Sequence, residues 1–361
     1  MNELIATPED LSMDDLCQEL VRLASRGNSV TDWPEDSLRL CADSGVFRWF
    51  LPEGKGGFGW SDRDQTLGYL RLAESDLVTT FVITQYMGAI RRIAASEHSS
   101  VADNWLERLV EGKVYATVGI SHLTTSRRHL AEPVLRAKET TDGFILSGMS
   151  PWVTGGAHAE LLVIGATLDC GRQILVAVPS ELEGVSRGVG VDLVALSASC
   201  TDRVEFREVH VRRSMLLGGP CENVLQSGVG ARTGGLQTST LAVGLSLAAL
   251  GFLEREAANR EDLSEPTQQL RAEVNELKKT LLLACDDSQV CEPSEIRARA
   301  NRLVLRSTQA ALMAAKGAGY VEGHPVGRWC RQALFFLVWS CPQPVSHAHL
   351  CELAFGSTEV S

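Results

Sequence analysis

Residues 143–166 read GFILSGMSPWVTGGAHAELLVIGA, two apolar and partly β-branched runs separated by a short glycine-rich corner. This pattern predicts two strands joined at the glycines, with Trp152 and Thr154 at the end of the first strand. An indole beside a hydroxyl at such a corner has two explanations. One is a buried corner tryptophan with a turn threonine. The other is a flat aromatic ligand that needs both a packing wall and a hydrogen bond.

Similar short runs extend on both sides of this stretch, from about Val114 to Leu217. Examples are KVYATVGIS, PVLRAKET, RQILVAVP and DRVEFREVHV, which are separated by turn residues such as TTDG and LDCG. Several such runs within about a hundred residues are typical of a compact β-barrel or sandwich. The middle of the chain is therefore predicted to be a small β domain.

Helical periodicity dominates the chain before and after this region. The run LSMDDLCQELVRLASRG has an apolar stripe that stops at Gly27, and in TDWPEDSLRLCADSGVF a helix is predicted between Pro34 and Gly45. After residue 217, four long periodic segments predict an antiparallel bundle. The predicted fold is α+β and multidomain, with an N-terminal α-helical domain (1–113), a central β-barrel or sandwich (114–217) and a C-terminal four-helix bundle (218–361).

Composition narrows the function class. The 361 residues carry a formal net charge of −11, which argues against a nucleic-acid or anionic membrane surface. The ten cysteines are scattered without a CxxC pair, no apolar run approaches the ~20 residues of a membrane span, and the first residues lack a signal peptide. These features predict a soluble, cytoplasmic protein with free thiols.

Four segments in order, LPEGKGGFGWS, GFILSGMSPWVTGGAHAELLVIGA, SASCTDRVEFREVHV and GAGYVEGHPVGRWCRQA, resemble the acyl-CoA dehydrogenase superfamily of flavoproteins. The resemblance covers nearly the whole chain, from about Asp36 to the end. It implies an FAD cofactor whose ring lies between the β domain and the helical bundle. It also implies an acyl-CoA or similar small-molecule substrate and a homodimer or homotetramer.

The resemblance assigns a flavin-side set of residues. WVT matches the family's Trp-Ile-Thr element, so Trp152 would pack beside the isoalloxazine, Val153 would take the middle position and Thr154 would hydrogen-bond the N5 edge. In VGISHLTTSRR, Ser121 matches a threonine whose hydroxyl meets the pyrimidine edge of the flavin. His122 replaces a glutamate in the same element.

Two arginines, Arg127 and Arg128, stand where the family carries Ser and Asp, and a polar surface loop explains this segment equally well. On the adenine side, Leu263 replaces a phenylalanine, Met313 a glutamine and Lys316 a glycine. The matching residues that remain are Arg260, Gly317 and Gly319.

The usual catalytic base of the family, a glutamate in a Tyr-Glu-Gly-Thr element, corresponds to Ser340. The alternative base position, before an arginine early in the bundle, corresponds to Ala231 beside Arg232. Neither position holds a carboxylate, so no catalytic residue is predicted. Cys341, next to Ser340, is interpreted as a buried core cysteine or a redox thiol.

Other titratable groups are weaker candidates. Glu322 and His324 are interpreted as surface groups. His347, His349 and Cys351 have alternate spacing that binds a metal only if their side chains converge, and a solvated tail is the favoured interpretation. No metal site is predicted.

Three functions are compatible with these observations. The first is an FAD-dependent oxidoreductase of the acyl-CoA dehydrogenase type, with a relocated or absent base. The second is a flavin monooxygenase of the same fold, which uses reduced flavin and oxygen and needs no base for an α-proton. The third is a non-catalytic relative that serves in binding or assembly.

Overall fold

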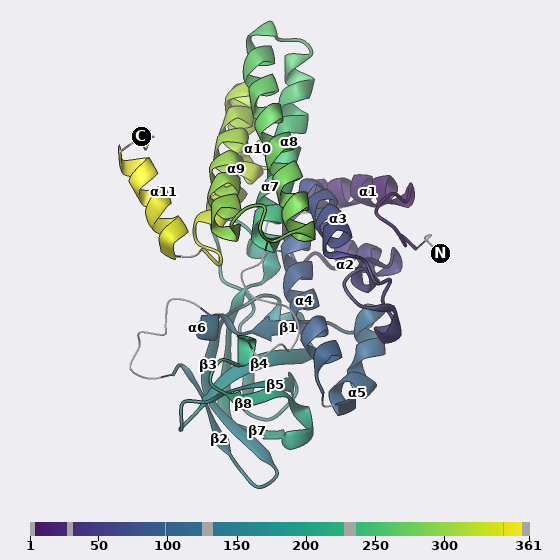
Figure 1. Ribbon diagram of the computed structural model, residues 1–361, viewed down its shortest axis with the longest axis vertical. Helices are drawn as coiled ribbons and strands as arrows, with labels where there is room; N and C mark the ends of the chain where they lie inside the picture. Colours follow the sequence, from purple (N-terminus) through teal and green to yellow (C-terminus); the bar gives the residue numbers. More distant parts are fainter. Residues whose placement is uncertain are drawn as a thin grey trace. The chain divides into compact units, whose positions relative to one another are not determined.

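The computed structural model describes residues 4–26, 32–97, 99–124, 133–226, 236–341 and 343–355 (Figure 1). Its contacts divide the chain into two compact units. Unit 1 contains residues 1–16, 27–60 and 81–233, and unit 2 contains residues 17–26, 61–80 and 234–361. The sheet belongs to unit 1, and most of the long helices belong to unit 2. The predicted domain boundaries at 113/114 and 217/218 stay a prediction.

Unit 1 is built around an eight-stranded sheet with the order β6-β7-β3-β2-β4-β5-β8, to which β1 is added by pairing with β4 (Figure 1). The β1–β4 and β2–β4 pairs are parallel and the remaining pairs are antiparallel. The strands are β1 Ala116–Gly119, β2 Leu135–Glu139, β3 Gly143–Val153, β4 Leu161–Leu168, β5 Gln173–Pro179, β6 Val185–Arg187, β7 Asp202–Arg212 and β8 Leu216–Cys221.

The core of this sheet is apolar because the β-branched and aromatic residues of successive strands face one side. The cluster takes residues from β2, β3, β4, β5, β7 and β8, which are the apolar runs that the sequence predicts as strands. Members of this cluster include Phe144, Leu146, Val153, Leu162, Ile164, Val176, Val204 and Phe206.

Helices α2 Glu35–Asp43 and α5 Ser99–Val110 also belong to unit 1, as does most of α4 Leu77–Ala95. Helix α2 begins directly after Pro34, which has its φ preset for a helix start, and is followed by Gly45 at φ +79°. Both ends of this helix confirm the prediction. Helix α1 spans Ser12–Arg26.

Unit 2 contains α3 Asp62–Ser75, α7 Gln237–Ala257, α8 Ser264–Asp286, α9 Pro293–Ala315, α10 Pro325–Leu334 and α11 Gln343–Phe355. Helices α7, α8 and α9 run side by side (Figure 1). In the described part of the chain, no helix is long and apolar enough to cross a membrane. The predicted order of helices, a sheet and then a helical bundle is confirmed.

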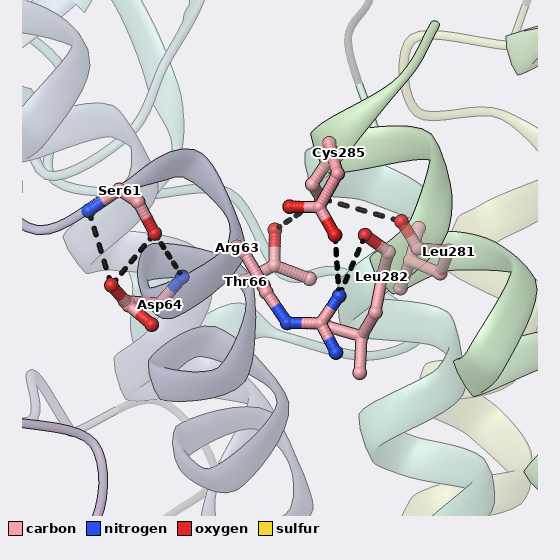
Figure 2. Close-up of polar contacts among 8 residues, drawn as sticks. Ser61, Arg63, Asp64, Thr66, Leu281, Leu282 and Cys285 are labelled. Carbon is pink, nitrogen blue, oxygen red and sulfur yellow. Dashed lines mark hydrogen bonds and ion pairs between the residues drawn. The ribbon is translucent and has the colours of Figure 1, made fainter. Parts of the chain in front are cut away.

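Polar contacts fix the start of α3 against the end of α8 (Figure 2). Ser61 and Asp64 form a capping box at the first turn of α3. Arg63 donates to Asp286 from its Nη1 atom at 2.7 Å. These contacts satisfy the helix end and define where α3 meets α8.

The middle of α3 packs closely on α7. A Cβ atom on Gly244 would lie 2.6 Å from Cβ of Ala73 and 2.9 Å from the carbonyl oxygen of Leu70. The hydroxyl of Thr66 lies 3.3 Å from Sγ of Cys285 on α8 (Figure 2). The small residues of STLAVGLSLAALG therefore serve close helix packing in unit 2.

Candidate functional site

A β-bulge near the end of β3 sets the position of Trp152. Ser150 pairs with Val204 and Val153 pairs with Asp202, so two residues of β3 lie opposite one residue of β7. Such a bulge re-aims a side chain. Trp152 has φ +56°, a conformation uncommon for a residue with a side chain, and 60% of it is exposed. The bulge therefore presents the indole as a flat surface outside the core.

Ser121 is hydrogen-bonded to the residue that precedes Trp152. Strand β1 ends at Gly119, the short helix α6 Ser121–Thr124 follows, and the Ser121 hydroxyl donates to the carbonyl oxygen of Pro151 at 2.8 Å. A Cβ atom on Gly119 would lie 2.6 Å from Oγ of Ser150, so this close approach of β1 and β3 needs glycine. The structure thus brings Ser121 beside Trp152.

Val153 and Thr154 point the other way. The Val153 side chain is fully buried in the sheet core. Thr154 is 3% exposed, and its hydroxyl lies 3.0 Å from the hydroxyl of Thr201, which in turn lies 2.8 Å from that of Ser199. The predicted contact of Thr154 with a flavin edge stays a prediction, and the described partner of its hydroxyl is Thr201.

An aromatic stack braces the corner after Thr154. Gly155 has φ +64°, and a Cβ atom there would lie 2.5 Å from the Trp33 ring. Trp33 stacks on His158 with ring centroids 4.3 Å apart and meets Tyr115 edge-on. Burial in this stack lowers the pKa of His158 below its ordinary value. Sequence reasoning missed Trp33, whose only signal was an aromatic residue in the segment TDWP.

His122 is a buried residue and not part of a polar surface loop. Its ring Nε2 lies 2.8 Å from the carbonyl oxygen of Gly165, and 8% of the residue is exposed. A Cβ atom on Gly165 would lie 2.4 Å from Leu123, so the glycine allows α6 to pack on β4. Arg127 and Arg128 lie outside the described residues.

Arg260, which the resemblance assigns to the adenine side of FAD, makes its described contacts within unit 2. Its Nη1 donates to the carbonyl oxygen of Ala314 at 2.7 Å, and Asp262 and Glu256 lie within 3.4 Å and 3.7 Å of the guanidinium. A cation at the carboxyl end of a helix is electrostatically favourable. Arg260 therefore caps the end of α9.

Lys316, the residue that replaces a glycine, keeps the backbone of a glycine. Its φ of +56° and ψ of −145° lie in a region that only glycine occupies without strain. A Cβ atom on Gly317 would meet nothing within 4 Å, whereas one on Gly319 would lie 2.7 Å from Cβ of Ala315. Position 316 thus has a backbone conformation suited to glycine although it holds a lysine.

Lys316→Gly should therefore stabilise the protein by about 1 kcal/mol, because the strain removed exceeds the entropy cost of glycine in the unfolded chain. The measurement is the urea midpoint of unfolding. Lys316→Ala is the matched control, since it removes the charge and keeps the strain, and it should give no increase. Equal midpoints for the two variants would show that backbone strain is not the cause.

The two positions that the resemblance assigns to a catalytic base hold Ser340 and Ala231. Ser340 is exposed and has φ +45°, and Ala231 and Arg232 lie outside the described residues. Glu322 is exposed, while His324 caps α10 by accepting a hydrogen bond at Nδ1 from the backbone N–H of Val326. His324 is therefore structural.

His347, His349 and Cys351 lie on helix α11. Positions four apart share a face of a helix, and Sγ of Cys351 lies 3.7 Å from Nε2 of His347. His349, two positions along, is 6% exposed. His347 is exposed, so the interpretation of this segment as solvated holds for His347 and not for the buried His349. Among the residues that the structure describes, no three metal-ligating side chains come together.

Comparisons with known proteins give a consistent result. No family model matches the chain. The mitochondrial short-chain specific acyl-CoA dehydrogenase of Sus scrofa is 21% identical over 341 residues, which are 88% of this chain and 81% of that protein. A solved glutaryl-coenzyme A dehydrogenase, in complex with glutaryl-CoA, has a TM-score of 0.80 at 16% identity over 96% of both chains. A glutaryl-CoA dehydrogenase from Mycobacterium smegmatis, in complex with FADH2, has a TM-score of 0.74 at 16% identity, covering 98% of this chain and 97% of that one.

Helices, an eight-stranded sheet and a helical bundle in this order define the acyl-CoA dehydrogenase fold. The chain has this fold and is similar over most of its length to proteins of the acyl-CoA dehydrogenase superfamily, in agreement with the resemblance.

Trp152 on β3 and the neighbouring Ser121 have features that a flavin ring needs. An indole that a strained bulge holds 60% exposed offers a flat face for an aromatic ring. The Ser121 hydroxyl is bonded to the carbonyl oxygen of Pro151, the residue that precedes Trp152. Both features fit a flavin ring, whereas the Thr154 hydroxyl has Thr201 as its partner.

Proposed function

We propose that this protein is a flavin-dependent oxidoreductase of the acyl-CoA dehydrogenase type, with FAD as cofactor and an acyl thioester or related small molecule as substrate. The observation that carries the proposal is the exposed Trp152 on the β3 bulge with Ser121 beside it, in a chain whose fold matches flavoenzymes of this type. When bound, the flavin supplies a two-electron acceptor for hydride.

The chain's own residues have separate tasks in this proposal. Trp152 forms one wall against the ring and excludes water from it. Ser121 meets the polar edge of the ring from a position fixed by the Pro151 carbonyl. The hydroxyl of Thr154 is oriented by the chain of Thr201 and Ser199, and Val153 contributes through its backbone because its side chain is buried.

A second candidate function is a flavin monooxygenase of the same fold. It is favoured by one observation, the exposed Ser340 at the position of the usual base. Removal of an α-proton needs a placed base, because that proton is weakly acidic. Chemistry that uses reduced flavin and oxygen has no such requirement, so a serine is compatible with it.

The proposal also includes the adenine side of FAD, the oligomeric state and the cellular location of the protein. Arg260, Gly317 and Gly319 would serve the adenine side of FAD. Exposed apolar side chains on unit 2 support a homodimer or homotetramer; they include Met313, Tyr320, Val321, Leu334 and Val338. The ten free cysteines support a cytoplasmic location.

Absorbance of the purified protein tests this function. We expect flavin bands at about one FAD per chain after incubation with FAD, and anaerobic bleaching by acyl-CoA thioesters of different chain length. Bleaching only by a separate flavin reductase, followed by oxygen consumption, would identify the monooxygenase. A protein that takes up no FAD would contradict both and leave the non-catalytic relative.

A further inference from the structure

Two buried residues of α9 donate hydrogen bonds to the segment that ends at Ser340, the residue at the position of the usual base. Arg297 is 5% exposed, and its Nη2 donates to the carbonyl oxygens of Phe336 at 3.0 Å and Trp339 at 2.7 Å. Asn301, one turn further along α9, is fully buried and donates from Nδ2 to the same Phe336 oxygen at 3.0 Å. All of these residues lie in unit 2.

These carbonyls need donors. Helix α10 continues into the short 3₁₀ helix η9 Phe335–Leu337, and the last carbonyls of a helix have no partner within it. A buried carbonyl without a donor costs about 1–3 kcal/mol. Arg297 and Asn301 donate the hydrogen bonds that the carbonyl oxygens of this helix end lack. We therefore expect them to determine where the chain leaves the helix.

The charge of Arg297 is directed at the same segment. Burial lowers its pKa to about 10, so it stays protonated at neutral pH. Among the described residues, no carboxylate lies within ion-pair distance of it. A buried cation without a carboxylate is costly, and the negative end of a helix is one place that compensates it.

The chain leaves this helix end through a strained turn. Trp339 stacks on Phe335 with ring centroids 4.9 Å apart, and Ser340 follows at φ +45°. Cys341 comes next. Burial raises the pKa of its thiol, and the nearby charge of Arg297 offsets part of this increase. A residue with a side chain keeps such a backbone only where its surroundings impose it.

We propose that Arg297, assisted by Asn301, is a positioning residue that fixes the turn Trp339–Cys341 and so determines where Ser340 presents its hydroxyl to the acyl thioester. The part that concerns the substrate rests on the proposed function. The part that concerns the turn stands on the contacts within unit 2.

The test compares Arg297→Met and Arg297→Lys in the full-length protein. Arg299→Met on the same helix is the matched control, because Arg299 pairs at the surface with Glu276. Hydrogen exchange of the peptide that contains residues 335–341 reports the turn. The pH profile of Cys341 alkylation by iodoacetamide, resolved by peptide mass spectrometry, reports the charge behind it.

We expect Arg297→Met to speed exchange in this peptide at least ten-fold and to move the Cys341 alkylation profile to higher pH, because the cation that favours the thiolate is gone. Arg297→Lys keeps the charge, so the profile should stay in place while exchange rises by a smaller factor. Arg299→Met should change neither. Exchange within two-fold of wild type and an unmoved profile in Arg297→Met would overturn the proposal.

If Arg297→Met fails to fold, Arg297→Lys and Asn301→Ala decide, since each loses donors to the Phe336 carbonyl while the cation stays. Unchanged exchange in both would be the refuting result.

Flavin content separates this proposal from the function itself. A wild type without FAD removes the proposed function and leaves the turn result intact. In a flavin-loaded protein, Arg297→Lys should slow acyl-CoA bleaching about ten-fold at unchanged flavin content, and an unchanged rate would refute the catalytic part.

Discussion

Trp152→Ala should weaken FAD binding by at least ten-fold. The substitution removes an indole that is 60% exposed and therefore available to cover one face of a ring. Aromatic contact and burial of this size contribute about 1.5–3 kcal/mol, and each 1.4 kcal/mol is a factor of ten in affinity. The measurement is equilibrium titration of the apoprotein with FAD.

Two other variants make this result specific. Trp152→Phe keeps a flat aromatic surface, so it should retain most of the affinity. Trp105→Ala removes an indole on another element, α5, where Arg108 lies over its ring, and should bind FAD like wild type. Equal FAD affinity of Trp152→Ala and Trp105→Ala would contradict the placement of the ring at β3.

Elements with a local signal are predictable from the sequence. Helix α2 lies between Pro34 and Gly45 because both residues have backbone preferences that act within one turn. Strand β4 is an apolar run that ends before the turn LDCG, and β5 follows it. These elements need no information about distant residues, so periodicity and turn chemistry suffice for them.

The direction of the site side chains is not predictable in this way. Trp152 faces outward because β3 bulges against β7, and the register of that pair is decided by residues about fifty positions later in the chain. The partner of Thr154 is Thr201, 47 positions away. His122 is a polar residue in a polar segment, which is typical of a surface position. It is nevertheless buried, because Gly165 allows α6 to approach β4. A motif match indicates which residues belong to the site. The direction of their side chains depends on packing with residues far away in the sequence.

Arg297 shows the same limit in unit 2. In the sequence it is one of several arginines in SEIRARANRLVLR, and nothing local separates it from Arg299 or Arg302. Only the fold places it against the carbonyls of Phe336 and Trp339. The positions around Ser340 were found by resemblance, but the residue that holds them was not.

Gly148→Ala should destabilise unit 1 by about 3 kcal/mol or more. Gly148 lies on β3, four residues before Trp152, at φ +124°. A Cβ atom there would lie 2.2 Å from the carbonyl oxygen of Val134 and 3.1 Å from Cα of Leu135. Because both obstacles are backbone atoms at the start of the neighbouring strand β2, no side-chain rotation relieves the clash and β3 has to move.

Gly171→Ala separates this clash from the cost of the backbone conformation. Gly171 has φ +82° in the turn between β4 and β5, and a Cβ atom there would meet nothing within 4 Å. Its substitution should cost only about 1 kcal/mol, the price of a side chain at positive φ. The measurement is urea unfolding followed by tryptophan fluorescence, with FAD affinity of the folded protein as a second readout. Since β3 carries the Trp152 bulge, a moved strand should also weaken FAD binding. Equal losses of stability in the two variants would mean that β3 accommodates a side chain at position 148, and that the path of the strand does not depend on this glycine.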